Sequence, residues 1–172
     1  MHKRHTRLPR FVHAEAQIDR FMCNPIMHYP NRDEEKAILQ NSLYEQHKPN
    51  IHLTAQDIHN AREHIAHMYC DDTIFDYIVN IVSATRTPST YGLRDLGEYI
   101  ECGASPRASI ALYHASRAYA FLKNRNFVTP DDVKAVAVDI LRHRIMRTFH
   151  AEADNVSNKQ IITTLLATIA VP

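Results

Sequence analysis

Apolar residues recur three or four positions apart along most of this chain, which is the spacing of amphipathic α-helices. Capping residues, acidic first turns and prolines bound most of these stretches. The main helices are predicted at Arg32–Gln46, Thr54–Met68, Thr73–Thr85, Pro106–Asn124, from Pro130 and after Ser157, with a short helix or turn at Leu93–Cys102. About six helices with short connections predict an all-α domain with an orthogonal or bundle-like arrangement.

The N-terminal part departs from this pattern. Ala14–Phe21 has the composition of a short helix, and the mixed hydrophobicity of Phe21–Tyr29 fits a strand that Pro30 ends. A single strand cannot satisfy its own backbone hydrogen bonds. We therefore expect this strand to belong to a sheet that the chain does not contain.

Length and charge narrow the class of protein. A chain of 172 residues, 45% of them hydrophobic, can bury one core, which predicts one domain or one domain and a fragment. The 20 Lys and Arg residues nearly balance the 19 Asp and Glu residues, although Met1–Arg10 is locally basic. Without an overall basic field, a nucleic-acid-binding domain is the least favoured class, and we expect no nucleic-acid partner.

Cysteine usage and hydropathy predict a cytoplasmic location. Cys23, Cys70 and Cys102 are far apart and form no C-x-x-C pair, which argues against a disulfide framework. The sequence has no apolar run of membrane-spanning length and no apolar region behind its basic start. We expect neither secretion nor a membrane partner.

Familiar metal and catalytic motifs are missing from the sequence. His64, His67 and Cys70 share a helix face, but their order matches neither H-E-x-x-H nor its inverted form, so a structural or solvated role is favoured and no metal site is predicted. No glycine precedes Lys-Ser or Lys-Thr, and no apolar strand ends in a magnesium-binding Asp-Glu pair. We expect no ATP hydrolysis by this chain alone.

Arg107 occupies an electrostatically awkward position. Ser105 is predicted to cap a helix that begins at Pro106, which places Arg107 in the first turn. A helix N-terminus carries a partial positive charge, so a cation there is unfavourable unless an anion, such as a phosphate, shares the site. A solvent-facing side chain, or a pair with Asp95 or Glu98, explains the residue equally well.

Several segments together resemble a known family. They are Glu15–Phe21, Tyr29–Pro30, Ala84–Arg86, Gly103–Ser109, Val128–Lys134 and Leu141–Arg144. In this order and spacing they resemble the MoxR family of AAA+ ATPases, from about Glu15 to the C-terminus. The resemblance implies that residues 1–30 are a remnant of the AAA+ core, with its arginine-finger helix and last strand, and that residues 31–172 form the helical lid domain of such an ATPase.

The resemblance also implies roles for individual residues. Arg20 matches the arginine finger, which reaches the nucleotide of a neighbouring subunit, although from the residues alone an ion pair or turn with Asp19 is the favoured explanation of Arg20. Arg107 matches the second sensor, which touches the phosphates bound by its own subunit. Tyr29 and Pro30 lie at the hinge between core and lid, where such residues line the adenine pocket.

The family further implies cofactors and partners. The full-length parent would bind ATP and Mg²⁺, form a ring with neighbouring subunits, and act in a chaperone-like way on client proteins, together with von Willebrand factor A domain partners. The chain departs from the family pattern in two ways. Arg7–Ala14 does not match the sequence that usually precedes the arginine-finger segment, and the core with its phosphate loop is missing. The alternative hypothesis is a stand-alone helical protein-interaction module without a nucleotide role.

Overall fold

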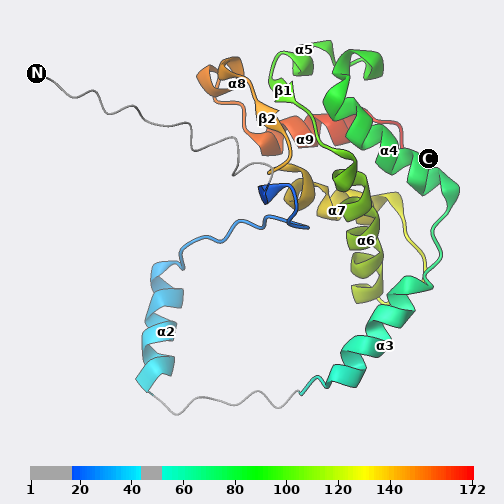
Figure 1. The fold of residues 1–172 in the computed structure, drawn as a ribbon. Coiled ribbons are helices and arrows are strands. Elements are labelled where there is room, and N and C mark those ends of the chain that lie inside the picture. Colours follow the sequence, from blue (N-terminus) through cyan, green and yellow to red (C-terminus); the bar gives the residue numbers. More distant parts are fainter. Residues whose placement is uncertain (1–16, 44–51) are drawn as a thin grey trace, which may run out of the picture. The chain divides into compact units, whose positions relative to one another are not determined.

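A computed structural model describes residues 17–43 and 52–172 of the chain (Figure 1). The described residues group into two compact units, of which one contains Pro25–His67 and the other contains residues 17–24 together with Met68–Pro172. The basic stretch Met1–Arg10 and the first residues of the predicted helix Ala14–Phe21 lie outside the described residues. The division of the chain at residue 30 stays a prediction.

The smaller unit contains the helices α2 (Arg32–Leu43) and α3 (Ala55–Ala66). As the sequence predicts, Thr54 and Asp57 form a capping box at the start of α3. The apolar stripe of α2 is not covered by any described residue, since the side chains of Ile38 and Leu39 are more than half exposed. The residues beyond Leu43 in the predicted Arg32–Gln46 helix lie outside the described part of the chain.

The larger unit carries most of the helices and a short antiparallel sheet. Its elements are α4 (Asp72–Arg86), η1 (Pro88–Tyr91), α5 (Arg94–Gly97), β1 (Ile100–Cys102), α6 (Pro106–Leu122), α7 (Pro130–Leu141), β2 (Met146–Arg147), α8 (Phe149–Ala153) and α9 (Asn158–Thr168). The helical fold class is confirmed. Sequence periodicity did not predict α8 or the β1–β2 pair, because elements of two to five residues are too short to show a period.

The strand predicted at Phe21–Tyr29 is not formed. After a helical pair at residues 17–18 and a turn, the chain runs through residues 21–29 without strand pairing. A strand needs a neighbouring strand to pair with its backbone N–H and C=O groups, and the described part of the chain supplies none there. Instead, the Asn24 N–H donates to the carbonyl oxygen of Asp139 near the end of α7, at 2.8 Å.

One apolar core joins the four long helices of the larger unit. Helix α6 packs against α7 and α4, and α9 packs against the same two helices (Figure 1). Side chains less than 2% exposed fill the space between them, and they include Tyr77, Ile81, Val82, Leu112, Val133, Ile140, Leu141, Ile161, Ile162 and Leu165. The small residues Ala108 and Ala120 on α6 let the neighbouring helices approach closely.

A buried carboxylate fixes the start of α7. The side chain of Asp132 is 2% exposed, accepts hydrogen bonds from the backbone and hydroxyl of Thr129, and forms an ion pair with Arg125. Burial by itself raises the pKa of Asp132, but the hydrogen bonds from Arg125 and Thr129 outweigh it, so the pKa lies below its ordinary value. The charged form therefore stabilises the cap.

A close backbone contact fixes the start of α6. Thr85, at the end of α4, accepts a hydrogen bond from the Ala104 N–H on its Oγ1 at 2.9 Å, and this hydroxyl donates to the carbonyl of Val82. A Cβ atom added at Gly103 would lie 2.4 Å from the carbonyl oxygen of Thr85. Only glycine lets the loop before α6 approach α4 so closely.

We predict that Gly103→Ala destabilises the larger unit by about 1–3 kcal/mol, because the new methyl group must displace the backbone of Thr85. The matched control is Gly97→Ala on α5, whose added Cβ would lie 3.9 Å from Pro88, an ordinary contact. We expect the control to be neutral or slightly stabilising. Urea unfolding followed by circular dichroism measures both, and equal stabilities of the two variants would contradict the packing argument.

Candidate functional site

The first turn of α6 has the geometry that the sequence predicts. Ser105 is the N-cap, with φ −72° and ψ 168°, and its hydroxyl accepts a hydrogen bond from the Arg107 N–H at 3.3 Å. Pro106 is the first helical residue. Arg107 therefore stands at the positive end of a helix, where a neighbouring anion is stabilising.

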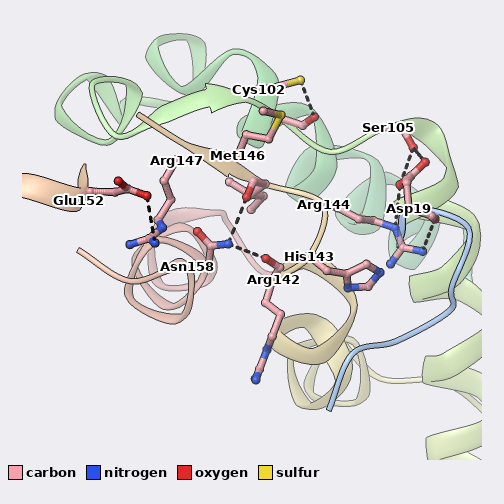
Figure 2. A pocket seen from close by; sticks show the side chains of 12 residues that line it. Asp19, Cys102, Ser105, Arg142, His143, Arg144, Met146, Arg147, Glu152 and Asn158 are labelled. Atoms are coloured by element: carbon pink, nitrogen blue, oxygen red, sulfur yellow. Dashed lines mark hydrogen bonds and ion pairs between the residues drawn. The ribbon is translucent and has the colours of Figure 1, made fainter. Parts of the chain in front are cut away.

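The anion beside Arg107 in the structure is Asp19. Nη1 of Arg107 lies 3.3 Å from Oδ2 of Asp19, and the hydroxyl of Ser105 donates to both carboxylate oxygens at 3.1 and 3.2 Å. Arg144 approaches the same carboxylate from the other side, with its Nε 3.1 Å from Oδ1 (Figure 2). We call Asp19, Ser105, Arg107 and Arg144 the Asp19 cluster.

The two arginines of the Asp19 cluster differ in exposure. The Arg144 side chain is 2% exposed, whereas that of Arg107 is 58% exposed and has one ion pair with the carboxylate. Burial lowers the pKa of Arg144, and the facing carboxylate of Asp19 opposes this shift. Arg144 is thus a fixed part of the interior, while Arg107 can reach another anion without uncovering a buried charge.

Arg144 was missed as a site residue by the sequence analysis. Its guanidinium also donates to the carbonyl oxygens of Asp19, Phe21, Met22 and Ile140 at 2.5–3.2 Å. The only signal in the sequence was its place at the end of Leu141–Arg144, one of the segments that carry the family resemblance, and that segment did not reveal the partners.

Arg20 lies beside the cluster with a free side chain. It is exposed, and it forms no side-chain hydrogen bond or ion pair with the described part of the chain. The ion pair with Asp19 considered above is not formed, because Asp19 is engaged by Arg107 and Arg144. A depression of about 210 Å³ is lined by both exposed arginines together with Asp19, Met22, Ile110, Ala111, His114 and Arg144.

Asp19 and Arg144 also line a larger cavity, of about 430 Å³ (Figure 2). Two of its arginines have protein partners: Nη2 of Arg142 pairs with Asp139 at 2.9 Å, and Nη1 of Arg147 donates to the carbonyl of Val156 at 2.9 Å. Nη1 of Arg142 and Nδ1 of His143 are buried without a hydrogen-bond partner among the described residues. Figure 2 shows the Arg142 side chain pointing away from Asp19. The smaller depression differs in being lined by two exposed arginines, Arg20 and Arg107.

The remaining predicted site residues lie in the smaller unit. Tyr29 and Pro30 belong to Pro25–His67, and both are exposed. Their role at an adenine pocket stays a prediction.

The described residues contain neither a cluster that could hold a metal ion nor a helix that could cross a membrane. Residues 17–43 and 52–172 contain no group of three or more His, Cys, Asp or Glu residues arranged to hold a metal ion. An arginine side chain at a helix N-terminus fits a phosphate group. None of the described helices has the length and hydropathy needed to cross a membrane.

The exposures of the two cluster arginines predict different effects on stability. We expect Arg107→Ala to lower the free energy of unfolding by at most about 1 kcal/mol, because its ion pair is solvent-exposed. Arg144→Ala should cost about 3–5 kcal/mol, because it removes a buried guanidinium and leaves part-buried carbonyl groups and one side of the Asp19 carboxylate without their donor. Urea unfolding of this chain measures both, and a cost for Arg107→Ala as large as that for Arg144→Ala would show that Arg107 is structural.

Comparisons with known proteins agree with the geometry of the lid. Residues 95–165 match the model of the AAA lid domain. The chain is 35% identical over 158 residues to Chaperone MoxR1 of Mycobacterium tuberculosis, covering 92% of this chain and 42% of that protein. It is also 35% identical over 104 residues to Protein MoxR of Paracoccus denitrificans, covering 56% of this chain and 30% of that protein.

A solved structure extends the match to three dimensions. It is a crystal structure of a protein from Cytophaga hutchinsonii provisionally assigned as an ATPase, with 36% identity and a TM-score of 0.85. The match covers 92% of this chain and 48% of that one, so the chain spans less than half the length of these relatives. Over the residues that it spans, this chain belongs to the MoxR family of AAA+ ATPases and contains its lid domain.

Proposed function

We propose that this chain supplies the lid and two phosphate-contacting arginines to a ring-forming ATPase that couples ATP binding and hydrolysis to chaperone-like remodelling or maturation of partner proteins. The observation that carries the proposal is the depression lined by Arg20 and Arg107. The Arg20 side chain has no hydrogen bond or ion pair in the described part of the chain, and Arg107 has one exposed ion pair. The nucleotide-binding core joined to this chain would hold ATP and Mg²⁺.

The chemistry of phosphoryl transfer explains why arginines suit this place. Negative charge on the transferred phosphoryl group and its leaving oxygen must be neutralised, and a guanidinium does so through directed N–H donors without changing its own protonation. In the proposed site, a phosphate oxygen would take the place beside Arg107 that Asp19 occupies in this chain. A nucleotide phosphate can therefore replace one weak ion pair at little cost.

The shared depression bears on which nucleotide each arginine contacts. The family resemblance assigns Arg20 to the neighbour's nucleotide and Arg107 to the nucleotide of its own subunit. Because Asp19 directly precedes Arg20 and pairs with Arg107, both arginines lie at one depression of a single chain. We therefore propose that both arginines approach the same nucleotide, the one bound by the neighbouring subunit.

The partners proposed for the complete ATPase are neighbouring subunits, client proteins and von Willebrand factor A domain proteins. The name Chaperone MoxR1 of the Mycobacterium tuberculosis relative supports the client proteins. The von Willebrand factor A domain partners and a cytoplasmic location rest on the resemblance and the sequence.

In an ATPase in which this chain is joined to a nucleotide-binding core, we expect Arg20→Ala to lower kcat by about 10³-fold or more. Arg107→Ala should lower kcat by about 10²-fold, the usual cost of losing one donor to developing charge. The control is Arg94→Ala, an exposed arginine on α5 outside the Asp19 cluster, which should leave kcat unchanged. Unchanged kcat in both site variants would contradict these roles, and no ATP binding in a calorimetric titration of the complete protein would favour the stand-alone interaction module.

Mixed rings decide between the two assignments of Arg107. The first kind of subunit carries Arg107→Ala on an intact core. The second kind keeps Arg107, but its core lacks the phosphate-loop lysine. Neither kind of subunit hydrolyses ATP efficiently alone. We expect activity to return on mixing, because the second subunit supplies Arg107 to the nucleotide of the first. The same mixture with Arg20→Ala is the positive control for contact between subunits, and a mixture that stays inactive only for Arg107→Ala would place this arginine on its own subunit's nucleotide.

A further inference from the structure

We propose that Arg144 is a positioning residue for Arg20: it holds the backbone on both sides of Arg20 so that this side chain projects toward the neighbouring nucleotide. The inference rests on the proposed function of Arg20. It gives a role to Leu141–Arg144, the segment of the family resemblance to which no function has been assigned.

The hydrogen bonds of Arg144 carry the argument. A guanidinium has five N–H donors in a planar fork. In Arg144, Nε donates to Oδ1 of Asp19, and Nη2 donates to the carbonyl oxygens of Asp19 and Phe21. Nη1 donates to the carbonyl oxygens of Met22 and Ile140. All five donors are therefore used, one on Ile140 of α7 and the other four on residues 19–22.

The segment that receives these bonds has little structure of its own. Residues 19–22 form a turn and a bend between the short helical pair at 17–18 and the extended stretch after residue 22. Two contacts with the end of α7 support Arg144, since a ring nitrogen of His143 lies 3.2 Å from the carbonyl of Phe21 and the Asn24 N–H donates to Asp139. The backbone around Arg20 is thus held by groups from the end of α7 and the loop that follows it.

The side chain of Arg20, between two held residues, is free. Asp19 and Phe21 flank Arg20 in the chain, and both accept hydrogen bonds from Arg144, whereas the Arg20 side chain is exposed. A catalytic side chain needs this combination of a rigid backbone and an open path, because a displacement of about 1 Å can cost about 10²-fold in rate.

Stability alone does not account for a guanidinium in this place. Removing an arginine from water is costly, and an apolar side chain of similar volume stabilises a protein interior as well or better. What the apolar side chain cannot do is set the position of four acceptors at once. The same carboxylate also pairs with Arg107, which contacts Oδ2 of Asp19 while Arg144 contacts Oδ1.

The test is Arg144→Lys in the ATPase formed by this chain and a nucleotide-binding core. Lysine keeps the charge but has three donors on a single nitrogen, so it cannot reach four acceptors arranged around a plane. We expect kcat to fall about 10-fold to 100-fold while KM for ATP changes less than about threefold, since Arg20 acts on the transition state. The matched control is Arg147→Lys, an arginine that donates to the carbonyl of Val156 and contacts no residue of 19–24, and it should leave both constants unchanged.

A double variant separates positioning from a general loss of structure. If Arg144 acts through Arg20, Arg144→Lys combined with Arg20→Ala should be no slower than Arg20→Ala alone. Multiplicative losses in the double variant, or an unchanged kcat in Arg144→Lys, would overturn the proposal.

Hydrogen exchange on this chain alone keeps the inference separate from the proposed function. We expect Arg144→Lys to speed exchange of the Phe21 and Asn24 amides at least tenfold, while the amides of α6 and α9 exchange at the wild-type rate. Unchanged exchange at Phe21 and Asn24 would overturn the positioning role. Failure of Arg20→Ala to lower kcat would instead overturn the proposed function, and the exchange rates would then show whether Arg144 holds the segment.

Discussion

The carboxylate of Asp19 is the interaction on which the candidate site depends. It accepts hydrogen bonds from two guanidinium groups and a hydroxyl, which come from the loop after α7 and the first turn of α6. Arg144 is buried and Arg107 is exposed. The carboxylate therefore forms one ion pair that is costly to break and one that another anion can replace. The position of Arg20 and the availability of Arg107 both follow from this arrangement.

The helices around this carboxylate are fixed by contacts that leave little freedom. The Gly103 loop lies against the backbone at Thr85, where a Cβ has no room, and this contact sets where α6 begins. Asp132, capped by Thr129 and paired with Arg125, sets where α7 begins. Because the apolar core holds these helices together, the fixed positions of their first residues also fix the positions of the side chains at the site.

Much of the fold could be predicted from the sequence. Periodicity and caps located α4, α6, α7 and α9, since each buries an apolar face long enough to show the helical period. The strand expected at Phe21–Tyr29 did not form, because apolar composition cannot supply a pairing partner. Of the site, Arg20 and Arg107 were singled out by motif, whereas Arg144 was not.

What the sequence determined by itself is therefore local: helix starts, the N-cap at Ser105 and the co-linear motifs that identify the family. Only the tertiary structure decided which charges meet. Asp19 lies 88 positions from Arg107 and 125 positions from Arg144, and sequence alone suggested Asp95 or Glu98 as the partner of Arg107. Local spacing constrains residues within a few turns of one helix, whereas partners this far apart are chosen by how the helices pack.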